Sequence, residues 1–148
     1  MIRNSICTII FLSLVLLHPH NGYCAKQTPE QFVSEFYQWY FKANSGKELA
    51  DRNDEIYKYV AKQTVDDIRR KVDNTDIYYF TKVNSYSWNW KNVRSIIHPA
   101  RAIGNKLYVT HVTFDTGYNK NDVIVSLTKE DGKFYIRSVE DVYPDILE

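Results

Sequence analysis

The chain has 148 residues, of which 44% are hydrophobic and 25% charged, the composition of an ordinary globular domain. This length suffices for one domain that buries a core without help from a metal or a disulfide. The formal net charge is +1, and the basic run 69–71 is flanked by Asp66, Asp67 and Asp73, so the chain lacks the basic stripe that nucleic-acid binding requires.

The N-terminus has the layout of a secretory signal peptide. A short basic start, 1–4, precedes the apolar run Ile6–Leu17 and the breaker-containing stretch His18–Gly22. The apolar run is too short to span a bilayer as an anchor. We therefore predict that residues 1–25 are a cleaved signal and that residues 26–148 form a single domain in the periplasm. A buried N-terminal helix is the alternative interpretation.

The two cysteines bear on cleavage and on anchoring. Cys7 leaves with the signal, so the mature chain keeps at most one cysteine and cannot form an intramolecular disulfide or a cysteine zinc site. Cleavage after Cys24 and cleavage after Ala25 both fit the small residues that signal peptidase reads. Lipidation of Cys24 is the one route to a membrane anchor, and the bulky Tyr23 before it argues against that route.

The first half of the domain has helical patterns. Thr28, Pro29 and Gln31 predict a helix start with a capping box, and the helix continues to about Asn44. Its apolar face is broad and comprises Phe32, Val33, Phe36, Trp39 and Tyr40, with Tyr37 and Phe41 at its flanks. A second helical segment is expected over 54–71, with a break near Gln63 and Thr64.

Between the helical and strand-like halves lies an aromatic segment, Asp76–Trp90. It contains Tyr78, Tyr79, Phe80, Tyr86, Trp88 and Trp90. Its spacing fits neither the helical nor the strand period, so we expect an irregular, partly helical connection. These rings either pack helices onto a sheet or form a recognition surface, and both interpretations stay open.

The second half of the domain predicts strands. Residues 93–103 contain His98-Pro99, which favours an edge or bulged strand. Strands are expected at 106–115, 122–129 and 134–139, joined by turns that contain Gly104, Gly117 and Gly132. Sequential strands with short turns predict an antiparallel meander. With the helices in the N-terminal half, the fold class is α+β.

Three pieces of the sequence resemble an exported bacterial family known as domain of unknown function 3828. They are Phe36–Tyr40, Asp76–Lys82, and the pair Val123–Leu127 with Lys133–Val139. The chain departs from the family pattern at Phe134, where the family tends to have tryptophan. The order of elements is similar to the cone of nuclear transport factor 2. The resemblance implies N-terminal helices packed on a curved antiparallel sheet and an envelope location, but no reaction.

Acid–base chemistry has one candidate pair. His111 and Asp115 fall on the same face of a predicted strand, where they could point into the cone as a proton-transfer pair. A strand histidine that bonds to backbone is the favoured alternative. The spacing of His98 and His111 matches no metal-ligand pattern, and there is no glycine-rich phosphate loop. The sequence therefore predicts no cofactor, no metal site and no catalytic residue.

Aromatic side chains are the stronger functional signal. Tyr86, Trp88 and Trp90 alternate, so one face of an extended segment would carry all three. Tyrosine and tryptophan are enriched at recognition surfaces. The predicted binding residues are therefore Tyr86, Trp88, Trp90, Tyr118, His111 and Asp115.

These observations favour a non-enzymatic periplasmic protein that binds another protein. One concrete form is an immunity protein that neutralises a toxin acting on the cell envelope. Two alternatives are a small-molecule binder that uses the interior of the cone and an enzyme that uses His111 and Asp115. A homodimer is expected by analogy with other cone domains.

Overall fold

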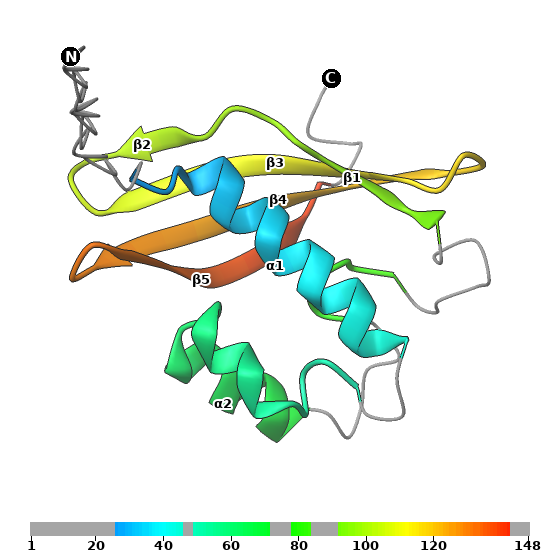
Figure 1. The fold of residues 1–148 in the computed structure, drawn as a ribbon, viewed down its shortest axis with the longest axis horizontal. Helices are drawn as coiled ribbons and strands as arrows, with labels where there is room; N and C mark the ends of the chain where they lie inside the picture. The colour runs from blue at the N-terminus through cyan, green and yellow to red at the C-terminus, as the bar shows by residue number, and fades with distance from the viewer. Residues whose placement is uncertain (1–25, 46–48, 72–77, 84–91, 143–148) are drawn as a thin grey trace, which may run out of the picture.

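A computed structural model describes residues 26–45, 49–71, 78–83 and 92–142 (Figure 1). The elements are α1 (Pro29–Asn44), the 3₁₀ helix η1 (Asp54–Lys58), α2 (Lys62–Lys71), β1 (Arg94–Ile97), β2 (Arg101–Ile103), β3 (Leu107–Asp115), β4 (Lys120–Glu130) and β5 (Lys133–Asp141). Within these residues no helix is both long and apolar enough to cross a membrane. The predicted signal, 1–25, lies outside the described residues.

The strands form one antiparallel sheet in the order β1-β3-β4-β5, with β2 also paired to β3. α1 crosses one face of this sheet, and η1 and α2 lie beyond the β5 edge (Figure 1). The α+β prediction is confirmed. We call the face that carries α1 the inner face and the opposite one the outer face.

The start of α1 follows from its sequence. The Gln31 N–H donates to the Thr28 hydroxyl at 3.2 Å, and the Thr28 N–H donates to the Gln31 side chain at 3.0 Å. This capping box and Pro29 at the first turn satisfy the free N–H groups of the helix end, as predicted. Tyr37, expected at the flank of the apolar face, is instead fully buried.

The edge strand is interrupted, as the His98-Pro99 pair predicts. Ile97 pairs with Val112 and Arg101 pairs with Val109, so three residues, 98–100, stand opposite two in β3. Proline cannot donate to a ladder, and the extra residue divides the edge into β1 and β2.

The second helical segment breaks earlier than the sequence predicts. The break lies between η1 and α2 rather than near Gln63 and Thr64. Its cause is the sheet edge: the Ile136 N–H donates to the Tyr59 carbonyl at 2.8 Å, and the Ala61 N–H donates to the Ile136 carbonyl at 2.9 Å. The Thr64 hydroxyl, expected to cap a helix, donates to the Arg137 carbonyl at 2.7 Å. Pairing with β5 therefore extends the backbone at this point.

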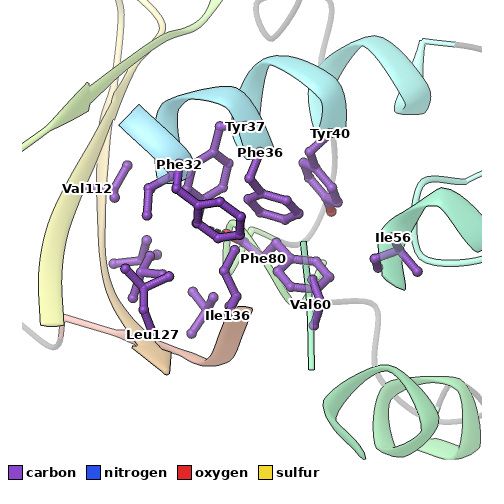
Figure 2. Packing of buried hydrophobic residues seen from close by; sticks show 14 of the residues in the cluster. Phe32, Phe36, Tyr37, Tyr40, Ile56, Val60, Phe80, Val112, Leu127 and Ile136 are labelled. Atoms are coloured by element: carbon purple, nitrogen blue, oxygen red, sulfur yellow. Dashed lines mark hydrogen bonds between the residues drawn. The ribbon is translucent and has the colours of Figure 1, made fainter. Parts of the chain in front are cut away.

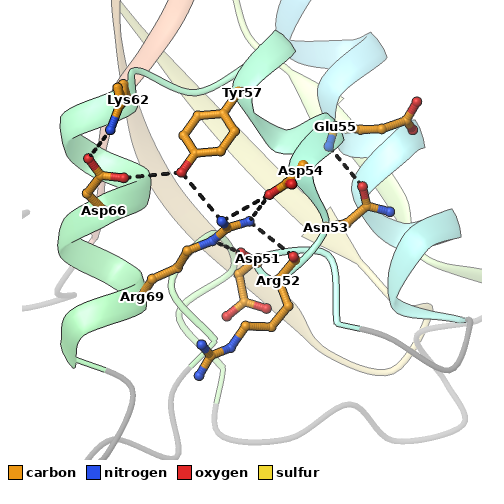
Figure 3. Close-up of polar contacts among 9 residues, drawn as sticks. All are labelled: Asp51, Arg52, Asn53, Asp54, Glu55, Tyr57, Lys62, Asp66 and Arg69. Atoms are coloured by element: carbon orange, nitrogen blue, oxygen red, sulfur yellow. Dashed lines mark hydrogen bonds and ion pairs between the residues drawn. The ribbon is translucent and has the colours of Figure 1, made fainter.

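Arg69 ties η1 and its preceding turn to α2 (Figure 3). Its guanidinium donates to the carbonyls of Asp51 and Arg52 at 2.9 and 3.1 Å and to the Asp54 carboxylate at 3.1 Å. The guanidinium also lies 5.2 Å from the centre of the Tyr57 ring. One planar side chain with several donors thus fixes a turn that has little regular structure of its own.

The described part of the aromatic segment, Tyr78–Val83, is a tight turn closed by the Tyr78 N–H bond to the Val83 carbonyl at 2.8 Å. Phe80 has no exposed surface, and its carbonyl accepts a hydrogen bond from the Tyr37 hydroxyl at 2.9 Å. Its ring lies against Phe36 and Tyr40 of α1. For Phe80 the expectation of a packing junction is confirmed.

The hydrophobic core fills the space between α1 and the inner face (Figure 2). Its members come from every layer: Phe32, Val33, Phe36, Tyr37, Tyr40, Ala50, Ile56, Val60, Val65, Ile68, Phe80, Val112, Phe114, Val123, Val125, Leu127, Phe134, Ile136 and Val139. Phe36, Tyr37 and Phe80 have no exposed surface. These rings occupy the interior where the small-molecule hypothesis requires a pocket.

The carboxylate of Glu30, in the first turn of α1, connects this helix to the edge of the sheet. Glu30 Oε1 accepts the Ala100 N–H at 2.8 Å, and this bond holds the pKa of the Glu30 carboxyl below its ordinary value, with partial burial opposing it. A carboxyl whose pKa is lower in the folded state stabilises the fold above its unfolded pKa. That stabilisation is lost as the pH falls through the folded pKa.

We expect Glu30→Gln to lower the free energy of unfolding at pH 7 by about 1 kcal/mol or less, because the site is partly exposed. The difference between wild type and variant should shrink as the pH falls below about 4. Urea titrations at pH 7 and at acidic pH measure this. Glu35→Gln is the matched control on the same helix. A Glu30→Gln difference that persists unchanged at low pH would contradict the assignment.

Candidate protein-binding surface

The outer face of the sheet carries the ionisable residues of the predicted site. Strand alternation sends Thr110, Val112 and Phe114 of β3 to the inner face, where all three are buried. His111 and Asp115 therefore belong to the outer face. α1 lies on the inner side and does not cover them (Figure 1).

Four side chains meet on the outer face, from the interruption between β1 and β2, from β3 and from β4. The rings of His98 and His111 stack, with centroids 4.4 Å apart and an interplanar angle of 17°. His98 Nε2 lies 3.2 Å from the Thr113 hydroxyl, and His111 Nε2 lies 2.9 Å from Asp122 Oδ1. The Thr113 hydroxyl also donates to Asp122 Oδ1. We call these residues the His98–Asp122 cluster.

The expectation that His111 points into the cone with Asp115 is wrong. His111 faces outward, and its carboxylate partner is Asp122 on the neighbouring strand. Asp115 lies four residues farther along β3, about 13 Å away at the rise of an extended strand. The regular alternation of β3 gives the inner positions to Thr110, Val112 and Phe114, which leaves His111 no access to the interior.

Asp115 has a structural task at the end of β3. It accepts the Gly117 N–H at 2.8 Å and pairs with Arg94 of β1 at 3.0 Å. The Gly117 N–H, and after it the Arg94 guanidinium, holds the pKa of the Asp115 carboxyl below its ordinary value. An ionised carboxylate fixed in this way anchors a turn and is poorly suited to exchange protons near neutral pH.

The described residues hold no group of three or more His, Cys, Asp or Glu side chains placed to bind a metal ion. The His98–Asp122 cluster presents stacked rings rather than nitrogens that converge on one point. Nothing in this arrangement resembles a nucleophile with its base. The chemistry that it supports is recognition through hydrogen bonds and ring surfaces.

Three large apolar side chains, one each in β1, β2 and the β3–β4 turn, are exposed. Ile96 is 42% exposed, Ile103 is 53% exposed, and Tyr118 is 73% exposed. Cross-strand pairing of Ile96 with Thr113 and of Ile103 with Leu107 puts both isoleucines on the outer face. We call the outer face with its exposed isoleucines and Tyr118 the outer surface. It combines apolar anchors with satisfied polar groups, the mixture found at protein interfaces.

The predicted binding residues divide into two groups. Tyr86, Trp88 and Trp90 lie outside the described residues. His111, Asp115 and Tyr118 all lie at the outer surface, but at different points along β3 and the turn after it. Their role in binding stays a prediction.

Sequence reasoning missed Asp122 and Thr113 as members of the cluster. The two residues are direct cross-strand partners, so the hairpin register joins them. That register was open to inference, because a turn centred on Gly117 and Tyr118 brings residues whose numbers sum to 235 opposite each other.

A second concave feature lies away from the outer surface. It is an open depression of about 460 Å³ lined by Tyr57, Val60, Ala61, Lys62, Glu130 and Tyr135. The Lys62 ammonium is already bonded to Asp66 at 2.6 Å. Because the Lys62 ammonium and the Tyr57 hydroxyl both bond to Asp66, two of the polar groups that line this depression are already satisfied within the protein.

No protein-family model matches this chain, and no curated protein sequence matches it. Solved structures that share its fold include two crystal forms of one complex. In the crystal structure of the type VI native effector–immunity complex Tae3–Tai3 from Ralstonia pickettii, a chain matches with a TM-score of 0.64 and 25% identity, over 79% of this chain and 97% of that chain. The fold is that of a chain in an effector–immunity complex.

The selenomethionine form of the same Ralstonia pickettii complex gives a TM-score of 0.65 at 23% identity, over 78% of this chain and 98% of that one. Both matches extend over nearly the whole of the known chain, so the fold is shared over almost all of that chain's length.

Proposed function

We propose that this protein is a periplasmic immunity protein that binds and neutralises an effector acting on the cell envelope. The observation that carries the proposal is the structural match to a chain of the Tae3–Tai3 complex over 97% of that chain. We assign this chain the role of the immunity subunit, which the exposed apolar side chains and the hydrogen-bonding groups of the outer surface support.

The compartment belongs to the same proposal. A signal at 1–25 would deliver the chain to the periplasm, where an effector of the envelope has to be met. Lipidation of Cys24 is the less favoured alternative, in which the chain keeps Cys24 and is tethered to the membrane. We also propose that the chain belongs to the domain of unknown function 3828 family and that it has the cone fold of nuclear transport factor 2. The three sequence pieces that resemble this family support the proposal. A homodimer stays a prediction that light scattering of the purified chain tests.

The outer surface supports a binding role. It offers Ile96, Ile103 and Tyr118 as apolar anchors, and the His98–Asp122 cluster supplies hydrogen-bonding groups between them. By contrast, core side chains of the described residues fill the space between α1 and the inner face, and this part of the chain gives no support to the small-molecule alternative. The separation of His111 from Asp115 removes the pair on which the enzyme alternative rested.

A protection assay tests the proposed function. Bacteria that export the protein encoded beside this chain's gene are expected to stop growing, and co-expression of the full chain should restore colony formation. The control is the same chain without residues 1–25, which stays in the cytoplasm and should not protect. If the adjoining protein is toxic and the full chain neither protects nor binds it in calorimetry, the proposal is wrong.

A further inference from the structure

The direction of each hydrogen bond in the His98–Asp122 cluster follows from the carboxylate at its centre. A carboxylate oxygen only accepts, so the Thr113 hydroxyl and His111 Nε2 both donate to Asp122 Oδ1. The Thr113 hydroxyl has one hydrogen and gives it to Asp122, so toward His98 Nε2, 3.2 Å away, it can only accept. Both histidines therefore carry a hydrogen on Nε2.

This arrangement leaves three acceptor atoms that the described residues do not use. A neutral imidazole with its hydrogen on Nε2 has a lone pair on Nδ1. No described residue donates to Nδ1 of His98 or His111, or to Oδ2 of Asp122. Within the described residues, Asn44 Nδ2 is the one side-chain nitrogen or oxygen that is buried without a partner. All three acceptors therefore reach solvent at the outer surface.

Negative charge accompanies these acceptors. Asp122 is 38% exposed, and its ion-pair contact in the described part of the chain is His111, which is charged only if protonated. Glu140 lies on the same row of the outer face, because His111 pairs with Ile124 and Ile124 pairs with Glu140. Glu140 is exposed and forms no ion pair with a described residue. Two carboxylates of this face are thus open to a cation from outside.

Cations border the acceptors along the strands. Lys120 stands two residues before Asp122 in β4, and Arg101 pairs with Val109, two residues before His111 in β3. Both side chains are exposed, and neither forms an ion pair within the described residues. A long basic stretch of a partner would meet these like charges, which disfavours it. The site therefore fits a single cationic side chain.

We propose that the His98–Asp122 cluster receives one arginine side chain of the effector, whose guanidinium donates to Asp122 Oδ2 and to the Nδ1 acceptors beside it. This inference rests on the proposed function and names the partner group of its outer surface. A guanidinium has five N–H donors in one plane and can serve acceptors on several side chains at once, whereas an ammonium has three around one point. Ile96, beside Thr113 and 42% exposed, offers apolar surface to the arginine stem.

The acceptors can be tested in the purified protein without a partner. Long-range ¹H–¹⁵N spectra distinguish a ring nitrogen that carries a hydrogen from one that does not. Each neutral ring of His98 and His111 is expected to have its hydrogen on Nε2 and a bare Nδ1. A bare Nε2 in either neutral ring would overturn the proposal.

Calorimetric titration with the purified product of the adjoining gene tests the site. Asp122→Asn keeps an oxygen for Thr113 and His111 but removes the charge, and is expected to weaken binding by about 20-fold or more. His111→Gln removes the Nδ1 acceptor and should weaken binding by about 5-fold. The matched control is Asp131→Asn, an exposed carboxylate in the β4–β5 turn at a φ of +48° that asparagine tolerates, which should bind as the wild type does.

A double-mutant cycle identifies the group on the effector. Each effector arginine is replaced by alanine and titrated against the wild type and Asp122→Asn, and a coupling of about tenfold with one arginine supports the site. If the wild type binds and Asp122→Asn binds within threefold of it, or the coupling falls on a lysine, the arginine site is wrong while the immunity role stands. If the wild type does not bind the adjoining protein at all, the proposed function fails and the arginine site fails with it.

Discussion

Replacing Phe80 with alanine is expected to lower the free energy of unfolding by about 3–5 kcal/mol. The ring has no exposed surface and lies 5.1 Å from Phe36, 5.4 Å from Tyr40 and 5.0 Å from Tyr79, measured between ring centres. Truncation removes the transfer energy of the ring and leaves a cavity among aromatic neighbours that cannot collapse into it. Urea denaturation followed by tryptophan fluorescence gives the loss.

The controls for Phe80 separate packing from aromatic character. Phe80→Leu keeps most of the volume and should cost clearly less than Phe80→Ala. Tyr118→Ala removes an exposed ring of similar size and should change stability by no more than about 0.5 kcal/mol. A loss below about 1 kcal/mol for Phe80→Ala would contradict the view that this residue fastens the aromatic segment to α1.

Replacing Arg69 with alanine is expected to lower the free energy of unfolding by about 2–3 kcal/mol. Its side chain is only 24% exposed, and it serves the carbonyls of Asp51 and Arg52, which lose their charged donor in the variant. The ion pair with Asp54 adds little, because that carboxylate is 86% exposed. Amide hydrogen exchange in η1 should accelerate more than exchange in the sheet.

Arg70→Ala is the matched control for Arg69, because it stands next in the same helix. Its side chain is 74% exposed and pairs with Asp67, so its removal should change stability by about 0.5 kcal/mol or less. Arg69→Lys keeps the charge without the planar fork and should recover only part of the loss. Equal effects for Arg69→Ala and Arg70→Ala would show that the turn does not depend on the guanidinium.

The elements predicted correctly are those that depend on residues close together in the sequence. The Thr28 capping box, the proline at the first turn and the apolar face set α1 in the sequence itself. The same holds for the interruption at Pro99 and for the alternation of β3. Each of these features depends on residues within a turn or a strand of one another, so a single sequence contains the necessary information.

The errors have a common physical origin in long-range contacts. The break between η1 and α2 lies where the backbone pairs with Ile136, some 75 positions later in the sequence, and no local pattern encodes that pairing. His111 was given the wrong partner because the sequence does not show which face of β3 is covered by α1. Without that knowledge the inner and outer faces of the strand cannot be told apart. The apolar residues of both faces, such as Val109 and Val112, made the choice ambiguous.

The pairing of the 59–64 segment with β5 also bears on aggregation. An uncovered edge strand exposes N–H and carbonyl groups that other chains can join. Here the Ile136 N–H and carbonyl bond to the backbone of Tyr59 and Ala61, and the Arg137 carbonyl accepts the Thr64 hydroxyl. The segment 59–64 precedes β5 in the sequence, so it is synthesised first and is available to pair with β5 as soon as that strand has been made. Variants that loosen the cover, such as a proline at Ala61, should therefore show themselves first as precipitation at high concentration.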